Sequence, residues 1–245
     1  MGTYVVSDLH GQRGVFEEGL KKINFSDNDF LYVLGDAIDR GPGGIAILQR
    51  IKNSPNMKLL IGNHELFMAN CINKELCLAG KDVDLWLNGN GGKETYTAFR
   101  ELSENDQADL MEWLRSRTMI KRVSVGDRDF VLCHSHYIKE YEDKPLADVP
   151  SDTAWDIAWL SPFRGDLYNG GPDYYAQYPE TFVIGHVPVQ RMAGLFDIVG
   201  AFDIVKAGNV VDIDGGCAYG RSVGPLECGA LFLRLEDMEV VKVKL

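Results

Sequence analysis

Two carboxylates and an arginine stand within five residues of one another in the run Gly35-Asp36-Ala37-Ile38-Asp39-Arg40-Gly41-Pro42. The run follows residues 30–34, an apolar stretch that predicts a buried strand, and its glycines and proline predict a turn. Carboxylates beside a guanidinium can hold a metal cation and an anion next to each other. The residues therefore point to chemistry on an anionic substrate at the end of this strand.

Four other apolar runs also end in polar side chains that can bind a metal. Residues 3–6 lead to Asp8 and His10, residues 58–61 to Asn63 and His64, residues 130–133 to His134 and His136, and residues 181–184 to His186. All five histidines of the chain lie at these strand ends. Because open α/β sheets place their ligands at the carboxyl ends of strands, the pattern predicts a single site there.

Each of these residues also has an ordinary structural interpretation. Asp36 could cap a helix that begins shortly after it, and Asn63 with His64 could form a turn. His134 or His186 could be hydrogen-bonded and inert. The pair Asp8 and His10, two residues apart and on one side of an extended chain, is a weak signal by itself. These interpretations are reasonable one by one but poor as an explanation of the whole set.

The elements that must position these side chains alternate between strands and helices. Amphipathic patterns predict helices at residues 15–22 and 44–53, and a further helix at residues 64–79. Ser103, three residues before Asp106, resembles a capping box that opens a helix through Leu114. Residues 210–214, 230–235 and 240–245 read as strands joined by glycine-rich turns. These patterns are compatible with an α/β (or α+β) fold.

The segment 137–180 differs from the rest of the chain. It is rich in Tyr, Trp, Pro and Gly and shows little periodicity. Because it lies between the fourth and fifth strand ends, we expect it to form a lid over the site. The alternative is that its aromatic residues pack a small helical subdomain.

Composition narrows the class of protein. At 245 residues, one large α/β domain or two small domains are both possible. The net charge of −11 disfavours nucleic acid or an anionic membrane as partner. Five cysteines without a CxxC pair fit reduced thiols, and no signal peptide or apolar membrane span is found. We expect a cytoplasmic monomer.

The motifs together resemble those of the metallophosphoesterases. They are Ser7-Asp8-Leu9-His10-Gly11, Gly35-Asp36-Ala37-Ile38-Asp39-Arg40-Gly41, Gly62-Asn63-His64-Glu65, the strand-end His134, and Gly185-His186-Val187-Pro188. The Asp-Arg-Gly and Gly-Asn-His-Glu forms resemble the phosphoprotein phosphatase branch, near its bacterial and phage serine/threonine phosphatases. The tail from Asp212 to Gly220 is also similar. The resemblance implies one calcineurin-like domain over residues 1–245, a sandwich of two mixed β-sheets flanked by helices.

The resemblance further implies a site with two divalent metal ions at the strand ends. Asp8, His10 and Asp36 would hold the first ion, and Asn63, His134 and His186 the second, with Asp36 bridging both. Mixed oxygen and imidazole ligands suit Mn, Fe, Zn or Ni, and we expect Mn. Two such ions against two carboxylates and a hydroxide leave a positive pocket in an acidic protein.

Four further residues would then bind or protonate the substrate, or orient the proton donor, rather than bind metal. By resemblance, His64 is the general acid and Asp39 orients it, because a carboxylate bound to imidazole fixes its tautomer and keeps a proton available. Arg40 resembles the phosphate clamp of the family, with an ion pair to a nearby carboxylate as the alternative. Arg164 is the candidate for a second clamp, although its spacing is loose.

Two departures from the family pattern bear on the site. Ser7 replaces the more usual glycine, a change that should not touch the ligands. His136 follows His134 by two residues and faces the same way along an extended chain, so either could be the ligand. The family form favours His134, and His136 would then lie behind the ligands or near the substrate.

The expected function is hydrolysis of phosphoserine and phosphothreonine in proteins, with phosphotyrosine as a further substrate, by a water bridging the metals. The alternative is a dinucleoside polyphosphate hydrolase, with diadenosine tetraphosphate as substrate, which shares the same motifs. A scaffold protein that has lost its ligands is a third hypothesis, but this chain keeps every expected ligand.

Overall fold

Two mixed sheets form the centre of the molecule. The computed structural model describes residues 1–164, 171–192, 202–222 and 227–245, and in this part of the chain each sheet has five strands. The first sheet contains, in order across it, β10 (Val240–Lys244), β9 (Gly229–Arg234), β1 (Thr3–Val6), β2 (Phe30–Val33) and β3 (Met57–Leu59). The second contains β4 (Ile120–Val125), β5 (Arg128–Cys133), β6 (Thr181–Ile184), β8 (Val210–Asp212) and β7 (Val205–Ala207).

The strands that carry the predicted site residues are parallel to their neighbours. In the first sheet β1, β2 and β3 run parallel, and Val6 pairs with Val33 at their carboxyl ends. In the second sheet β5, β6 and β8 run parallel, while β4 and β7 are antiparallel edge strands. Parallel pairing in both sheets brings the predicted motifs to one edge of the sandwich.

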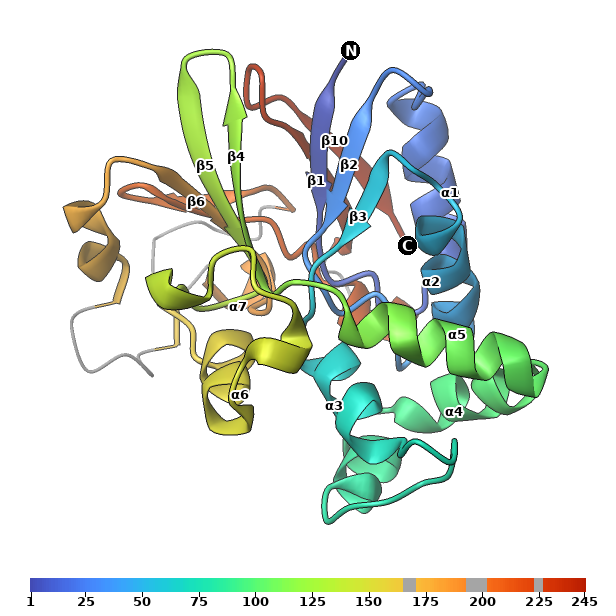
Figure 1. Ribbon diagram of the computed structural model, residues 1–245. Coiled ribbons are helices and arrows are strands. Elements are labelled where there is room, and N and C mark those ends of the chain that lie inside the picture. Colours follow the sequence, from blue (N-terminus) through green and yellow to red (C-terminus); the bar gives the residue numbers. More distant parts are fainter. Residues whose placement is uncertain (165–170, 193–201, 223–226) are drawn as a thin grey trace.

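The two sheets face each other across an apolar layer. Leu34, Leu132, Val183, Ile213 and Leu233 belong to this layer and are fully buried. Figure 1 shows the sheets side by side, with α1 (Arg13–Lys22) and α2 (Gly44–Lys52) along the outer face of the first. This confirms the α/β sandwich of two mixed sheets flanked by helices.

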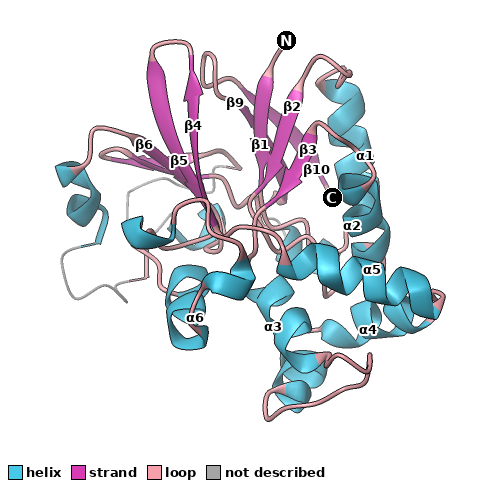
Figure 2. Cartoon of the chain, viewed as in Figure 1, coloured by secondary structure: helices cyan, strands magenta, loops and turns pink. Residues whose placement is uncertain are grey.

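The remaining helices lie near the carboxyl ends of the strands (Figure 2). They are α3 (Asn63–Cys71), α4 (Gly92–Arg100), α5 (Glu104–Arg115), α6 (Ser151–Trp159) and the short α7 (Val189–Met192). A π-helical turn, η1 (Leu85–Gly89), precedes α4. The 3₁₀ turns are η2 (Lys139–Tyr141), η3 (Leu146–Asp148), η4 (Gly171–Gln177) and η5 (Cys217–Ser222). No helix within the described ranges is both long and apolar enough to span a membrane.

Local patterns predicted most elements within one or two residues, with one clear error. The predicted helix at residues 64–79 ends at Cys71, because Ile72 turns extended and pairs with Leu78 in a β-bridge. The side chain of Asn73 holds this turn by accepting from the Cys77 amide. Ser103 caps α5 as predicted, since its Oγ accepts from Asp106 N at 3.2 Å.

The described part of segment 137–180 packs its aromatic residues together, as the alternative interpretation of the sequence expected. Its tyrosines pack together, with the rings of Tyr137 and Tyr175 5.0 and 4.8 Å from that of Phe182. Residues 165–170 lie outside the described part of the chain, and the lid stays a prediction.

Candidate active site

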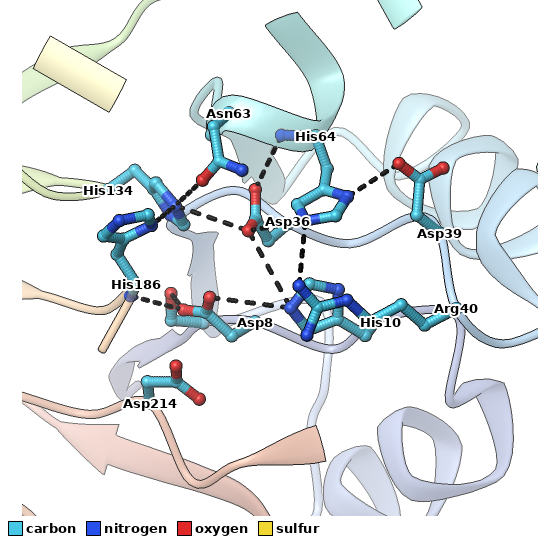
Figure 3. Close-up of polar contacts among 12 residues, drawn as sticks. Asp8, His10, Asp36, Asp39, Arg40, Asn63, His64, His134, His186 and Asp214 are labelled. Carbon is cyan, nitrogen blue, oxygen red and sulfur yellow. Dashed lines mark hydrogen bonds and ion pairs between the residues drawn. The ribbon is translucent and has the colours of Figure 1, made fainter. Parts of the chain in front are cut away.

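The loops that follow β1 and β2 are joined by backbone hydrogen bonds. Asp8 N donates to Gly35 O at 3.1 Å, and His10 N donates to Asp36 O at 2.8 Å. Asp8, His10 and Asp36 all adopt positive φ angles, of 54°, 43° and 50°. Such angles are unfavourable for residues other than glycine, so the network holds a strained conformation. In this conformation the three side chains converge on one region (Figure 3).

Glu65 fastens the third motif to the second. Its fully buried carboxylate accepts from the amides of Asp36 (2.7 Å), Ala37 (2.8 Å) and Gly62 (3.1 Å). Burial raises the pKa of Glu65, and the three N–H donors oppose this by stabilising the ionised form. Residue 62 must be glycine here, because a Cβ would lie 2.3 Å from Asp36 Oδ1. The loops after β2 and β3 are therefore one connected unit.

The second sheet contributes two histidines that are bonded to the first. His134 Nδ1 contacts the Leu34 carbonyl at 2.8 Å, so Nδ1 carries the proton and Nε2 keeps its lone pair. His186 is held through its own amide, which donates to Asp8 Oδ2 at 3.0 Å. Both imidazoles are thus oriented by groups from the opposite sheet.

Side chains that could hold a metal form two groups that share Asp36, and one of these groups includes His64, which was predicted as the general acid and not as a ligand. Ligand atoms of Asp36, His134 and His186 lie within 4.8 Å of one another, and so do those of His10, Asp36 and His64. Asn63 Oδ1 is 3.0 Å from His134 Nε2, which places it in the first of these groups.

Asp8 completes the predicted set from the other side of His10. Its Oδ1 lies 3.9 Å from His10 Nε2, and Asp36 Oδ2 lies 3.8 Å from the same nitrogen. All six predicted ligands are thus brought together at the ends of five strands.

The electrostatics of these groups fit divalent cations. Burial is the main cause that lowers the pKa of His10 and of His186 well below the usual value, so both are neutral near pH 7. Burial also raises the pKa of Asp36 well above its usual range. A carboxylate this deeply buried is stable as an anion only beside a cation, and neutral imidazoles are metal ligands. The donor set contains no thiolate, which suits the borderline divalent ions.

His64 makes a second type of contact. Its Nδ1 lies 2.7 Å from Asp39 Oδ2, an oxygen that also accepts from the Trp86 indole nitrogen at 2.9 Å. Its Nε2 lies 3.7 Å from Asp36 Oδ2 and 3.4 Å from Arg40 Nη2. The imidazole is thus held on one side by Asp39 and presents Nε2 to the ligand groups on the other.

A cleft of about 220 Å³ lies over these groups. Three arginines line it, namely Arg40, Arg164 and Arg191, together with the aromatic residues Trp159 and Tyr219. Arg164 Nη1 lies 3.3 Å from His186 Nε2, so this predicted residue does reach the site. The cleft therefore offers cationic and aromatic side chains above a set of metal-ligating atoms.

His136, the alternative ligand, lies apart from both groups. Its Nδ1 contacts the Tyr175 hydroxyl at 2.9 Å, and burial lowers its pKa to about 4. The strand end turns after His134, so the two histidines do not face the same space. The geometry favours His134.

Sequence reasoning missed three residues of the cleft or its support. Trp86, Asn90 and Arg191 come from segments without a recognised motif. The cluster of glycines and asparagines at residues 88–92 was the available signal for the first two. Asp214 and Tyr219, noted only as part of the tail, also line the cleft.

Fold and site together define a class of protein. Carboxylates, imidazoles and an amide that converge at strand ends in two groups with one residue in common are a donor set that suits divalent metal ions. The family pattern described as calcineurin-like phosphoesterase matches residues 1–194. The chain belongs to this family, whose members use divalent metal ions.

Two proteins illustrate what the chain is similar to in sequence. One is the "Bis(5'-nucleosyl)-tetraphosphatase, symmetrical" of Acidovorax sp. (strain JS42), 31% identical over 180 residues, which are 72% of this chain and 59% of that protein. The other is the "Serine/threonine-protein phosphatase 2" of Salmonella typhimurium, 27% identical over 188 residues, which are 76% of this chain and 79% of that one. The chain thus spans about three fifths of the tetraphosphatase. The second likeness supports the phosphoprotein phosphatase branch.

A solved structure supports the fold. The metallophosphoesterase from Sphaerobacter thermophilus has a TM-score of 0.56 at 16% identity, over all of this chain and 88% of that one.

Proposed function

We propose that the protein hydrolyses dinucleoside tetraphosphates at a site with two divalent metal ions. The observation that carries this proposal is the cleft, in which Arg40, Arg164 and Arg191 surround the ligand groups. One phosphate monoester carries two negative charges, whereas a tetraphosphate chain extends over several phosphates that can each meet a guanidinium. The similarity to proteins named as symmetrical tetraphosphatases supports the same substrate. This reverses the order in which the sequence placed the two substrates.

The metal ligands in this proposal are the predicted ones. Asp8, His10 and Asp36 would hold one ion, and Asp36, Asn63, His134 and His186 the other. When bound, such ions supply Lewis acidity and an activated water.

The other residues act on the substrate. His64 donates a proton from Nε2 to the oxygen that leaves phosphorus, and Asp39 holds its Nδ1–H. Arg40 binds phosphate oxygens beside His64, while Arg164 and Arg191 bind more distant phosphates of the chain. Trp159 and Tyr219 offer faces for the bases.

Phosphoprotein hydrolysis is the second candidate. It is favoured by the likeness to the Salmonella phosphatase, of which this chain covers a larger share than it does of the tetraphosphatase. A phosphoserine could be bound by the ligand groups with Arg40 and Arg164, the two predicted clamps. Arg191 would then have no phosphate to bind.

The test compares two substrates on the metal-stripped protein reloaded with Mn²⁺. Diadenosine tetraphosphate and a phosphoserine peptide are supplied at matched concentrations, and products are separated by chromatography. We expect kcat/KM for the dinucleotide to exceed that for the peptide by about tenfold or more, because one further arginine–phosphate contact is worth about 1–3 kcal/mol. ADP should be the only nucleotide product, as cleavage in the middle of the chain requires.

Two variants serve as controls. His64→Asn should lower turnover about 100-fold while the metal content stays the same, because only the proton donor is removed. Glu112→Gln, an exposed change on α5, should have no effect. Preferential release of phosphate from the peptide would overturn the substrate and keep the site.

A further inference from the structure

Trp86 lies behind the pair Asp39 and His64, in a segment that no catalytic motif includes. It belongs to the π-helical turn η1, and its side chain is fully buried. Isolated π-helical turns are rare and occur frequently at functional sites. The indole Nε1 donates to Asp39 Oδ2 at 2.9 Å, the same oxygen that accepts from His64 Nδ1 at 2.7 Å. One carboxylate oxygen therefore links the two rings.

This bond is costly to remove because Asp39 has few other partners. Its carboxylate is fully buried, and within the described residues the second oxygen, Oδ1, has no hydrogen-bond partner. A buried carboxylate requires donors to stay ionised and in place. Apart from His64 itself, Trp86 is the donor that the described contacts provide to the Asp39 carboxylate.

The same segment also holds the backbone of the catalytic turn. Asp39 and Arg40 have φ angles of 68° and 65°, a conformation unfavourable for side chains of this kind. Asp39 N donates to Thr95 Oγ1 at 2.9 Å, and Arg40 N donates to Gly91 O at 3.0 Å. Residues 86–95 thus form three hydrogen bonds to two consecutive strained residues. Structure elsewhere in a protein must compensate for such strain.

The segment is shaped for this contact. A Cβ on residue 92 would lie 2.3 Å from the Trp86 indole nitrogen, so only glycine leaves room for the ring. The edge of the ring also packs against Tyr96, with centroids 6.3 Å apart. The ring is therefore fixed from two sides with its N–H directed at Asp39.

We infer that Trp86 is a positioning residue for proton donation: its indole N–H fixes the Asp39 carboxylate, which in turn fixes the His64 imidazole. The inference rests on the proposed role of His64 as the proton donor. Residues 86–95 are the structural support of this donor, and Thr95 and Gly91 hold the turn on which Asp39 and Arg40 stand.

The kinetic test uses Trp86→Phe, which keeps an aromatic ring and removes the N–H. The Mn²⁺-loaded enzyme is assayed with phenyl phosphate, whose leaving oxygen needs a proton, and with p-nitrophenyl phosphate, whose leaving group departs readily as an anion. We expect kcat for phenyl phosphate to fall about tenfold, as for loss of one hydrogen bond to a charged group, with KM within about twofold. The loss with p-nitrophenyl phosphate should be under about threefold.

A double-mutant cycle separates positioning from general damage. In a His64→Asn background, Trp86→Phe should cause no further loss, because the group that it positions is gone. Trp113→Phe on α5 is the matched control, since this ring packs against Arg117 away from the cleft. An equal loss on both substrates, or in the His64→Asn background, would contradict the inference.

A measurement on metal-free protein covers the case in which Trp86→Phe does not fold. The chain has four tryptophans, so a ¹⁵N-labelled sample gives four indole N–H signals. One should exchange slowly with solvent and should shift in Asp39→Asn; four unchanged signals would overturn the inference. This readout does not depend on activity. If the wild-type enzyme hydrolyses neither diadenosine tetraphosphate nor either aryl phosphate, the proposed function fails and the indole result still decides the contact.

Discussion

The predicted metal ligands come from the loops of both sheets, but the two sets of loops are attached to the protein in different ways. In the first sheet they follow β1, β2 and β3, and in the second they follow β5 and β6. The first-sheet loops are bonded to one another through backbone amides and through Glu65. The second-sheet histidines are bonded across the gap, His134 to the Leu34 carbonyl and His186 to Asp8. The first-sheet loops therefore form a rigid frame, and the second-sheet histidines dock onto it.

From this difference we expect a site that is preorganised at one side and more adjustable at the other. The frame contains the strained residues Asp8, His10 and Asp36, whose conformations need many simultaneous contacts. The docked side contains Trp159 at the end of α6, Arg164 in the turn that follows it and Arg191 on the short α7, and all three line the cleft. In the proposed function, the frame would carry the chemistry and the docked side would contribute to the choice of substrate.

The largest effect is expected at the residue common to both ligand groups. Asp36→Asn removes a charge that both ions would share, so we expect metal content to fall for both and turnover to drop about 1000-fold or more. His186→Asn affects only the docked side and should leave about one ion bound. Metal analysis by mass spectrometry, together with turnover, checks this. Equal metal loss in the two variants would contradict the proposed difference between the first-sheet loops and the second-sheet histidines.

The next effect concerns the frame itself. The Glu65 carboxylate now accepts from three backbone N–H groups. In Glu65→Gln the NH₂ group of the new side chain would face these N–H groups, so that a donor would meet a donor. We expect the free energy of unfolding to fall by about 2–3 kcal/mol and the affinity for Mn²⁺ to fall about 10- to 100-fold. Urea unfolding and metal titration measure the two quantities. Normal metal affinity in a destabilised protein would show that Glu65 supports the fold but not the site.

The frame could be predicted from sequence because each of its residues lies next to a strand in a short motif. Asp8, Asp36 and Asn63 could be identified because each lies within three or four residues of an apolar run. His134 was identified in the same way, and the choice between it and His136 needed the turn after β5. The two-sheet fold followed from resemblance to the family rather than from periodicity.

The docked side and the supporting segments could not be predicted because their contacts join distant parts of the chain. Trp86 and Asp39 are 47 residues apart, and nothing local to Trp86 indicates a carboxylate partner. The early end of α3 at Cys71 depends on the bridge between Ile72 and Leu78, which overrides a helical pattern. The cytoplasmic location and the monomeric state stay predictions.

A smaller effect is expected at the rim of the docked side. Arg164→Ala removes a guanidinium from the cleft without touching the frame. Because one exposed phosphate contact is lost, we expect KM for diadenosine tetraphosphate to rise about tenfold and kcat to change less than about threefold. KM for p-nitrophenyl phosphate should stay unchanged. Steady-state kinetics on both substrates checks this. A fall in kcat on both would place Arg164 with the frame and would contradict the division between the two sides.

The smallest effect is expected at the ion pair that attaches residues 137–180 to β4. It tests whether this attachment affects turnover at the site. Arg122 on β4 donates to Glu142 Oε1 at 2.8 Å and Oε2 at 3.2 Å, and this pairing lowers the pKa of Glu142 below its usual value. Because the folded-state pKa is depressed, the stabilisation is present above the unfolded-state pKa of about 4.5 and is lost as the pH falls through the folded-state value.

Glu142→Gln should therefore lower the free energy of unfolding by about 1 kcal/mol at pH 7, since the pair is only partly buried, and by less at pH 4. Urea unfolding at both pH values measures this, with the exposed Glu140→Gln as control. Turnover should not change, because the pair lies outside the residues that line the cleft. If turnover falls along with stability, the second-sheet side is not adjustable but is held as tightly as the frame, and the distinction between the two sides is wrong.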